Sequence, residues 1–217
     1  MFHTVLFDLD GTLTDPELGI TNSVAYALKK WGIEVEDKRS LRCFIGPPLK
    51  ESFMGRYGFS REDALKSIEY YREYYRDQGI YENELIPGTE WILEELKRRG
   101  KRIILATSKP EEFAEQILKY FHIDGHFDVI AGATMGETRN LKSEVIAYAL
   151  ERAGITKPEG VIMVGDREHD VLGAKECGIP CIGVLFGFGS REELTSCGAA
   201  YIAGSMEEVF SIIQANE

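Results

Sequence analysis

The stretch TVLFDLDGTLTD, residues 4 to 15, places a short apolar run directly before two aspartates. Val5 to Phe7 predict a buried β-strand, because continuous apolar runs are typical of strands covered on both faces. Asp8 and Asp10 are two residues apart, so in extended chain their side chains point to the same side. Two carboxylates held that close repel, and one resists ionisation unless a cation lies between them. The pair therefore predicts a metal site, an acid/base pair, or both.

The composition is that of an acidic globular protein. The chain has 217 residues, 44% of them hydrophobic, which is enough for one substantial domain and a smaller one. The formal net charge of −11 argues against a nucleic acid partner, since lysine and arginine drive contact with the phosphate backbone. An anionic substrate would need a metal ion or a placed lysine to offset this charge.

The sequence gives no sign of a membrane segment or a secretion signal. No apolar stretch is long enough to span a bilayer, and the first residues, MFHTVLFDLD, have neither a basic start nor a small-residue cleavage site. We therefore expect a cytoplasmic location and no membrane partner. The four cysteines form no CxxC pair and are expected to be reduced thiols. Monomer and homodimer both stay open.

Later apolar runs predict the rest of a sheet. They are Arg102 to Ala106, Val129 to Ala131, Val161 to Val164 and Cys181 to Leu185. From about residue 88 they alternate with segments of helical apolar spacing, a pattern that predicts an α/β fold with a mostly parallel sheet. Ser190 to Glu193 matches the capping box that starts a helix, and the GFGS before it is only a weak match to a dinucleotide loop.

The pattern changes between the first strand and Pro87-Gly88, where no run reads clearly as a strand. Asp15 and Pro16 are typical of a helix start, and Ser60 to Asp63 predicts another helix that runs through Tyr75. We therefore expect two domains. Residues 1–15 and 86–217 would form the α/β core, and residues 16–85 a helical insert.

Polar residues follow three of the predicted strands. Asp8 follows the first, Thr107-Ser108-Lys109 follow the second, and GDREHD, residues 165 to 170, follows another. Strands of a parallel sheet share a direction, so these residues are expected at one edge. Open α/β sheets bind their ligands at that carboxyl edge.

This set of motifs resembles the haloacid dehalogenase superfamily. Four motifs occur in the family's order: DLDGTLTD, IILATS, the lysine of RNLKSEV (Lys142), and GDREHD. The resemblance covers nearly the whole chain and implies a Rossmann-like parallel-sheet core with an inserted all-helical cap. Phosphoglycolate-phosphatase-like and nucleotidase-like members are the most similar, and IGPPLKESF resembles their cap loop.

The resemblance implies a phosphatase acting on a small phosphorylated metabolite. It assigns the attack on phosphorus to Asp8, and general acid and base catalysis to Asp10. Thr107 would hold phosphate oxygens, and Lys142 would balance charge on Asp8 and on the transferred group. Gly11 allows the backbone to turn close to the phosphate, where a side chain would obstruct it.

A magnesium ion is the implied cofactor, because it suits an oxygen-only site that keeps several waters. Asp8 and Asp166 are the expected carboxylate ligands. The resemblance implies the backbone carbonyl of Asp10 as a further ligand, and Asp170 would act through water.

Substrate contacts are expected from both domains. The amide of Ser108 would hold phosphate. Lys109 could touch phosphate, support a residue that does, or lie on the surface. Arg42, Gly46 and Lys50 surround the expected cap loop, where a basic residue suits a second anionic group on the substrate.

Other functions compete with phosphate hydrolysis. A mutase of the same fold would pass the phosphoryl group to a sugar, and the chemical motifs do not separate it from a phosphatase. A catalytically dead binding module would be expected to have lost Asp8 or Asp10, and both are present. Phosphoglycolate, a nucleoside monophosphate and a sugar phosphate all stay open as substrates.

Overall fold

The computed structural model describes residues 1–136 and 138–216, and the chain divides into two compact units. The first, the α/β unit, joins Met1–Thr14 to Leu85–Glu217, and the second, the helical unit, is Asp15–Glu84. These boundaries differ by one residue from those expected from the sequence.

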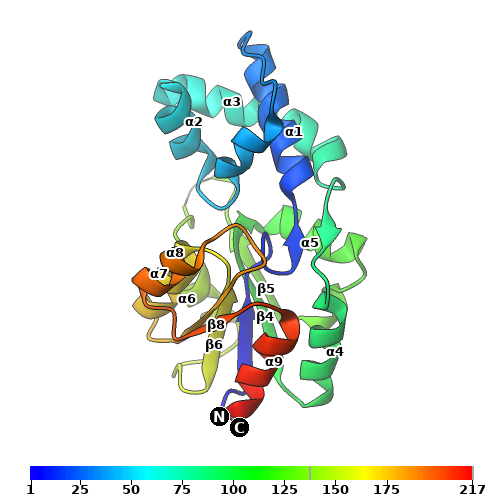
Figure 1. Cartoon of the computed structure of the whole chain (residues 1–217), viewed down its shortest axis with the longest axis vertical. Helices are drawn as coiled ribbons and strands as arrows, with labels where there is room; N and C mark the ends of the chain where they lie inside the picture. Colours follow the sequence, from blue (N-terminus) through cyan, green and yellow to red (C-terminus); the bar gives the residue numbers. More distant parts are fainter. Residues whose placement is uncertain (137, 217) are drawn as a thin grey trace. The chain divides into compact units, whose positions relative to one another are not determined.

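The α/β unit contains a six-stranded sheet in which every neighbouring pair of strands is parallel (Figure 1). The strand order is β5-β4-β1-β6-β7-β8. The bounds are β1 Thr4–Phe7, β4 Arg102–Pro110, β5 Val129–Ala133, β6 Val161–Gly165, β7 Cys181–Val184 and β8 Tyr201–Ala203. The predicted α/β class and Rossmann-like core are therefore confirmed.

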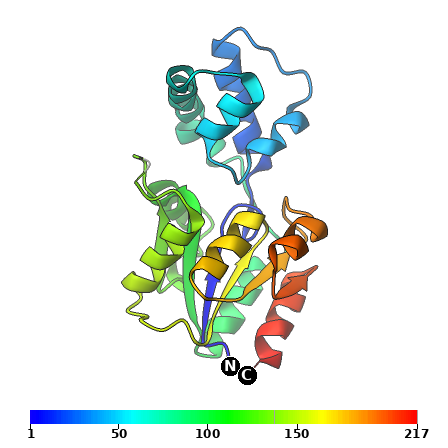
Figure 2. The same cartoon turned by 90° about the vertical axis from the view of Figure 1, so that its left-hand side faces the viewer.

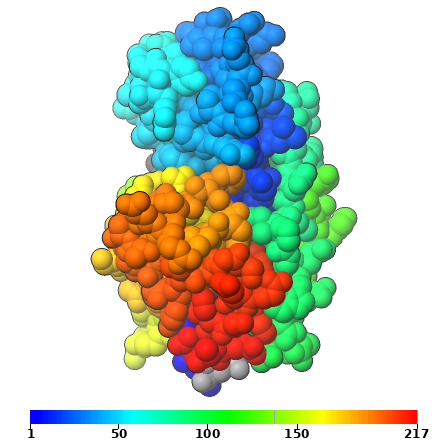
Figure 3. Space-filling model, in the orientation of Figure 1, coloured from blue at the N-terminus to red at the C-terminus, as the bar shows by residue number. Residues whose placement is uncertain are grey.

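Helices cover both faces of this sheet (Figure 2). The first face carries α6 (Lys142–Arg152), α7 (Glu168–Glu176) and α8 (Arg191–Cys197), and the second carries α4 (Thr89–Arg98), α5 (Glu111–Tyr120) and α9 (Met206–Ala215). Leu6 belongs to the cluster packed against the first face, while its neighbours Val5 and Phe7 are fully buried too. Burial on both faces explains why the strands read as continuous apolar runs. Residues of α8 and α9 form part of the surface in Figure 3.

The chain passes between the two units twice. The passages are the short strands β2 (Thr14–Asp15) and β3 (Glu84–Leu85), which pair with each other in a two-stranded sheet. The sequence pattern did not reveal these strands, since two residues are too few to show a period.

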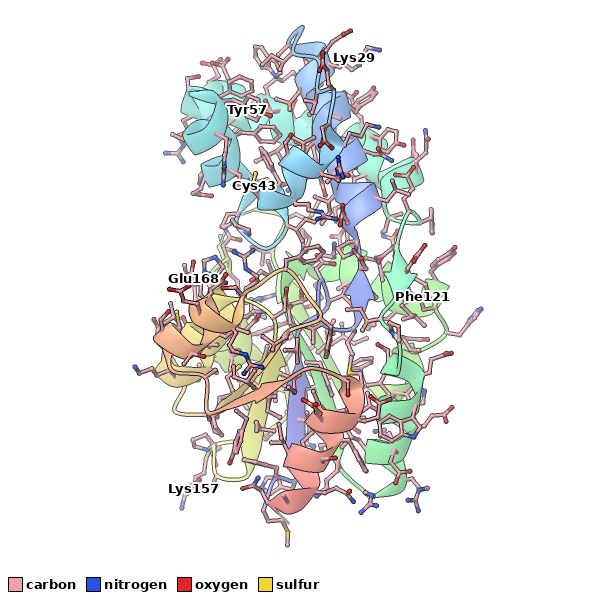
Figure 4. All side chains as sticks on the ribbon, in the orientation of Figure 1. Lys29, Cys43, Tyr57, Phe121, Lys157 and Glu168 are labelled. Carbon is pink, nitrogen blue, oxygen red and sulfur yellow. The ribbon has the colours of Figure 1, made fainter. Side chains whose placement is uncertain are left out.

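The helical unit is built from α1 (Glu17–Lys30), α2 (Leu49–Tyr57) and α3 (Arg61–Tyr74), with a 3₁₀ segment η1 (Lys38–Phe44) and a π turn η2 (Tyr75–Gly79). Helix α1 begins one residue later than expected, with Pro16 in the N-cap position, although Asp15 Oδ1 still accepts a hydrogen bond from the Glu17 N–H at 2.9 Å. Figure 4 labels Tyr57 at the end of α2 and Cys43 in η1.

Aromatic rings fill much of the core of the helical unit. Phe53 packs on Phe44 and Phe59, and Tyr71 stacks on Tyr75 with ring centroids 5.2 Å apart. Such pairs add about 0.5–1.5 kcal/mol each beyond the area that they bury.

In the described part of the chain, no helix is both long and apolar enough to cross a membrane.

Candidate active site

Asp8 stands at the carboxyl end of the central strand. Its N–H donates to the Val164 carbonyl at 2.9 Å, which extends the pairing of β1 with β6 by one residue. The neighbouring strands β4 and β6 therefore place their own carboxyl ends beside it, as a parallel sheet requires. Only 9% of Asp8 is exposed, so its charge needs partners within the protein.

Lys142 is the main cationic partner of Asp8. Its Nζ lies 2.8 Å from Asp8 Oδ1 and 2.6 Å from Asp170 Oδ1, and it donates to the Ala106 carbonyl at 3.0 Å. Burial alone would lower the pKa of Lys142, but the carboxylates of Asp170 and Asp8 raise it well above its usual value. Lys142 is therefore a permanent charge that holds one oxygen of Asp8 in place.

Three carboxylates lie close together here, and two of them contact this lysine. Asp8, Asp166 and Asp170 each offer an oxygen, and these oxygens lie within 4.8 Å of one another. Burial raises the pKa of Asp166 well above its usual value, and the charges of Asp170 and Asp8 raise it further. Burial likewise raises the pKa of Asp170, even though Lys142 acts in the opposite direction. One lysine thus does not neutralise the three acids.

The cluster fits a divalent cation. Asp166 is fully buried, and its Oδ1 has no hydrogen-bond partner among the described residues, while its Oδ2 accepts from the Phe188 N–H at 2.7 Å. A buried carboxylate oxygen without a partner is costly unless it binds a proton or a cation. Carboxylate oxygens are the ligands that hard divalent ions prefer. Asp8, Asp166 and Asp170 could therefore hold such an ion.

Asp10 lies outside this cluster and has a lysine of its own. Lys109 Nζ is 2.8 Å from Asp10 Oδ2, and Asp10 Oδ1 is buried without a hydrogen-bond partner in the described part of the chain. Burial raises the pKa of Asp10, Lys109 opposes that rise, and Asp8 adds to it. The two aspartates of the opening motif thus have separate cationic partners. A surface position for Lys109, which the sequence left open beside a phosphate contact or a supporting role, is wrong, because the residue is buried.

The other predicted residues of the α/β unit lie on the same strand ends. Thr107 is buried in β4, and its Oγ1 accepts a hydrogen bond from the Lys109 N–H at 3.2 Å. Ser108 lies between them and is partly exposed. The chain bends here, because the pairing of β4 with β5 is irregular between Thr107 and Pro110.

Gly11 turns the chain after the second aspartate, with φ at +79°. A Cβ at Gly11 would lie 2.3 Å from Asp166 Oδ2 and 2.8 Å from the Phe188 ring. The structure therefore adds a reason for this glycine that the sequence did not suggest. Gly11 leaves room for the Asp166 carboxylate as well as turning the chain.

The loop after β7 is a part of the site that sequence reasoning missed. A Cβ at Gly187 would lie 2.3 Å from the Gly11 carbonyl, and one at Gly189 would lie 1.9 Å from the Asp166 carbonyl. The GFG tripeptide thus packs by its backbone against two motifs of the site. Its glycines were the available signal, but they were compared only with a dinucleotide loop.

The three predicted cap-loop residues belong to the helical unit. Arg42 Nε lies 2.7 Å from Glu17 Oε1, and Lys50 Nζ lies 3.4 Å from Glu51 Oε1. Gly46 is exposed, with φ at +100°. A role for these residues in binding the leaving group stays a proposal.

Comparisons with known proteins agree with the geometry. The model of the haloacid dehalogenase-like hydrolase family matches residues 5–184. A 5′-nucleotidase of Pseudomonas aeruginosa is 42% identical over 215 residues, which cover 99% of this chain and 97% of the relative. Tyrosine-protein kinase PtkA of Mycobacterium tuberculosis is 39% identical over 209 residues, 94% of this chain and 70% of the kinase. The crystal structure of a predicted phosphatase from Clostridium acetobutylicum has a TM-score of 0.95 at 47% identity and covers 99% of both chains.

Proposed function

Because the chain belongs to the haloacid dehalogenase-like hydrolases and is a phosphatase of that family, we propose that it hydrolyses nucleoside 5′-monophosphates through a phosphoaspartate, with magnesium as cofactor. The observation that carries the proposal is the Asp8 carboxylate, held 2.8 Å from Lys142 beside Asp166 and Asp170. The relative named 5′-nucleotidase, which matches almost the whole chain, favours a nucleotide over phosphoglycolate or a sugar phosphate.

The first step is attack by Asp8. An oxygen of its carboxylate forms a bond to phosphorus while the bond from phosphorus to the ester oxygen breaks, which leaves an acyl phosphate on the protein. Lys142 contributes a fixed positive charge where negative charge builds up on the transferred group. Removing one such group from a site typically costs about 10² to 10³ in rate.

Asp10 manages the proton in both steps. As a carboxylic acid it protonates the departing alkoxide, and as a carboxylate it then takes a proton from the water that attacks the acyl phosphate. The ion pair with Lys109 stabilises the carboxylate, whereas burial and Asp8 favour the protonated form. Opposed influences of this kind suit a group that must alternate between two protonation states.

The remaining residues bind rather than react. The Thr107 hydroxyl and the Ser108 amide would hold phosphate oxygens at the end of β4. Asp8 and Asp166, with Asp170 and the Asp10 carbonyl, would hold a magnesium ion. When bound, that ion supplies charge neutralisation for the carboxylates and the phosphate.

The helical unit, Asp15–Glu84, is proposed to act as a cap that selects the leaving group. Arg42, Gly46 and Lys50 are the residues proposed to read it. Hydrolysis needs enclosure for strong electrostatic contacts, yet it also needs water to enter and product to leave. Movement of a cap on the two linking segments would meet both demands.

A second candidate function is phosphoryl transfer to a hydroxyl other than water. The observation that favours it is the relative named tyrosine-protein kinase, which is 39% identical over 94% of this chain. The same phosphoaspartate would form, but a sugar or tyrosine hydroxyl would replace water in the second step, as in the mutase reading of the motifs.

A substrate panel separates these possibilities. It contains 5′- and 3′-nucleoside monophosphates, phosphoglycolate and a hexose phosphate, each with magnesium, calcium or a chelator, and the readout is released inorganic phosphate. We expect the highest kcat/KM with a 5′-monophosphate and magnesium, and no turnover by Asp8→Asn. A higher kcat/KM with phosphoglycolate would contradict the substrate class. Phosphate release that requires an added alcohol or tyrosine peptide would favour transfer.

A further inference from the structure

The segment from Gly187 to Glu193, which joins β7 to the first turn of α8, contacts Asp166 and the turn that connects Asp166 to Asp170. Its first contact is by backbone. The Phe188 N–H donates to Asp166 Oδ2 at 2.7 Å, while Asp166 Oδ1 is buried with no hydrogen-bond partner among the described residues. The glycines on either side of Phe188 permit this approach, since a side chain at either would overlap Asp166 or its neighbours.

The second contact is by the Glu193 side chain. Glu193 Oε1 accepts two hydrogen bonds, from Arg167 Nε at 2.9 Å and from the Glu168 backbone N–H at 2.9 Å. Burial would raise the pKa of Glu193, but these two donors hold it below its usual value, so the side chain is ionised. A capping-box reading assigns this carboxylate to the start of its own helix. The structure shows that it turns to another loop instead.

That loop carries two of the three carboxylates. Arg167 and Glu168 lie between Asp166 and Asp170, and the Arg167 N–H donates to Asp170 Oδ2 at 3.1 Å. Figure 4 labels Glu168 at the start of α7 and Lys157 before β6, at the two ends of that strand. Through its hydrogen bonds to Arg167 and Glu168, Glu193 therefore contacts the middle of the turn that sets the spacing of Asp166 and Asp170.

The backbone of Glu193 is itself held in place by its neighbours in the chain. The Ser190 Oγ accepts from the Glu193 N–H at 3.1 Å, and Leu194, the next residue, is fully buried in the core cluster of the first face. Helices α7 and α8 are in contact. A side chain anchored in this way can fix a neighbouring loop, because its own backbone has little freedom to move.

We propose that Glu193 is a positioning residue for the metal site, holding the Asp166–Asp170 turn so that its carboxylates are spaced for a divalent cation. The inference rests on the proposed metal site and goes beyond it, since no part of the hydrolytic scheme uses Glu193. Partners of ligand residues commonly change metal affinity by about 10- to 100-fold when they are altered. Glu193 acts one residue further out, so we expect an effect near the lower value.

Two variants separate the length of the Glu193 side chain from its charge, and the two properties predict opposite effects on the affinity for the cation. Glu193→Gln keeps the length and an oxygen in the Oε1 position, so a positioning role predicts affinity near wild type. Glu193→Asp keeps the charge but is one methylene shorter, so the acceptor no longer reaches Arg167 and Glu168. A long-range charge effect would reverse this order. Glu192→Asp, an exposed neighbour in the same helical turn, controls for shortening alone.

The test is a Mn²⁺ titration of the whole protein without substrate, with free Mn²⁺ measured by electron paramagnetic resonance. We expect Glu193→Asp to bind about tenfold more weakly, with Glu193→Gln and Glu192→Asp within about threefold of wild type. At saturating Mg²⁺, kcat of Glu193→Asp should recover to near wild type. Wild-type affinity in Glu193→Asp, or weak binding by Glu193→Gln alone, would overturn the inference. A wild-type protein that binds no Mn²⁺ would instead refute the metal site on which it rests.

Discussion

At the scale of single residues, the site is a problem of charge balance. Lys142 contacts Asp8 and Asp170, while Asp166 Oδ2 accepts a hydrogen bond from the Phe188 backbone amide. At an effective dielectric constant near 20, each contact of Lys142 gains about 6 kcal/mol of Coulomb energy before the cost of desolvation. The three buried acids still outnumber this one cation. Burial raises the pKa values of Asp166 and Asp170, and the neighbouring carboxylates raise them further.

Lys142→Met tests this balance directly. Without the lysine, the buried carboxylates repel, so we expect the free energy of unfolding to fall by about 3–5 kcal/mol in the absence of divalent ions. Added Mg²⁺ should restore part of that loss, and kcat should fall by about 10² to 10³. Urea denaturation with and without Mg²⁺ measures the first effect. Lys157→Met, on the exposed loop before β6, is the control. Equal losses in the two variants would contradict this reading.

At the scale of elements, parallel strands bring distant motifs together. Asp8, Thr107 and Asp166 lie at the carboxyl ends of β1, β4 and β6, which are adjacent in the sheet. Contacts between elements also hold the amino end of β4. There the Ile103 N–H donates to Asp128 Oδ2 at 2.8 Å, and Asp128 Oδ1 pairs with Lys97 at 2.9 Å.

Asp128 should make stability depend on pH. Burial would raise the pKa of Asp128, but Lys97 and the Ile103 amide hold it below the usual value of an aspartate. A lowered carboxyl pKa stabilises the fold above the unfolded value, and that contribution is lost as pH falls through the folded value. Since a third of the side chain is exposed, we expect Asp128→Asn to cost only about 0.5–1 kcal/mol at pH 7. The difference in the free energy of unfolding between wild type and Asp128→Asn, measured by urea denaturation, should become smaller below about pH 4. A difference that does not change with pH would refute the link between the protonation of Asp128 and stability. Asp124→Asn is the control.

The helical unit depends on a close approach between α1 and the π turn η2. A Cβ at Gly19 would lie 1.9 Å from the Gly79 carbonyl, and backbone cannot move aside cheaply. We expect Gly19→Ala to lower the free energy of unfolding by about 3 kcal/mol. Gly55→Ala, in α2 with nothing within 4 Å of the new methyl group, should be neutral or gain up to about 1 kcal/mol. Thermal unfolding of the two variants makes the comparison, and similar midpoints would refute the packing argument.

Strands buried on both faces were predictable because their apolar runs are unambiguous, and the family's spacing then located Asp8, Asp10, Asp166 and Lys142. Strand β8 was missed, since it has only three residues at the sheet edge and the first two are only partly buried. The resemblance paired Lys142 with Asp8, a contact that the structure shows, but nothing in the sequence paired Lys109 with Asp10. Asp10 and Lys109 are 99 residues apart, and their contact depends on β1 and β4 being neighbours.

The role of Glu193 was misread for a different physical reason. A local pattern predicts a local partner, and Ser190 does cap its helix as expected. The Glu193 carboxylate had a stronger alternative in Arg167, a cation brought close by the packing of α7 on α8. The sequence of one helix start does not reveal whether a carboxylate binds a partner in its own helix or one that the fold brings close.

At the scale of the whole molecule, the chain separates chemistry from the proposed selection of substrate. Every residue assigned to the reaction lies in the α/β unit, and the proposed cap loop lies in the helical unit. The two units are joined by the segments that contain β2 and β3. A division of this kind predicts that substitutions in one unit change which substrate is used and substitutions in the other change how fast it reacts.

Lys50→Met and Arg42→Ala test that division. We expect kcat/KM for the preferred nucleotide to fall by about tenfold or more, the effect of losing one charged contact. The rate with p-nitrophenyl phosphate, which lacks a second anionic or sugar group, should stay within about twofold. Arg56→Ala, an exposed residue at the end of α2, serves as the control. If both substrates slow equally, the assignment of the cap loop is wrong.

Asp8 is proposed to carry the phosphoryl group during turnover. The most direct measurement is a rapid acid quench of the enzyme with a ³²P-labelled nucleoside 5′-monophosphate, followed by mapping of the labelled peptide. We predict one alkali-labile label on the peptide that contains Asp8, formed no more slowly than phosphate is released. The Asp8→Asn variant should acquire none. Phosphate release by the wild type with no labelled peptide, or the same label in Asp8→Asn, would contradict the account.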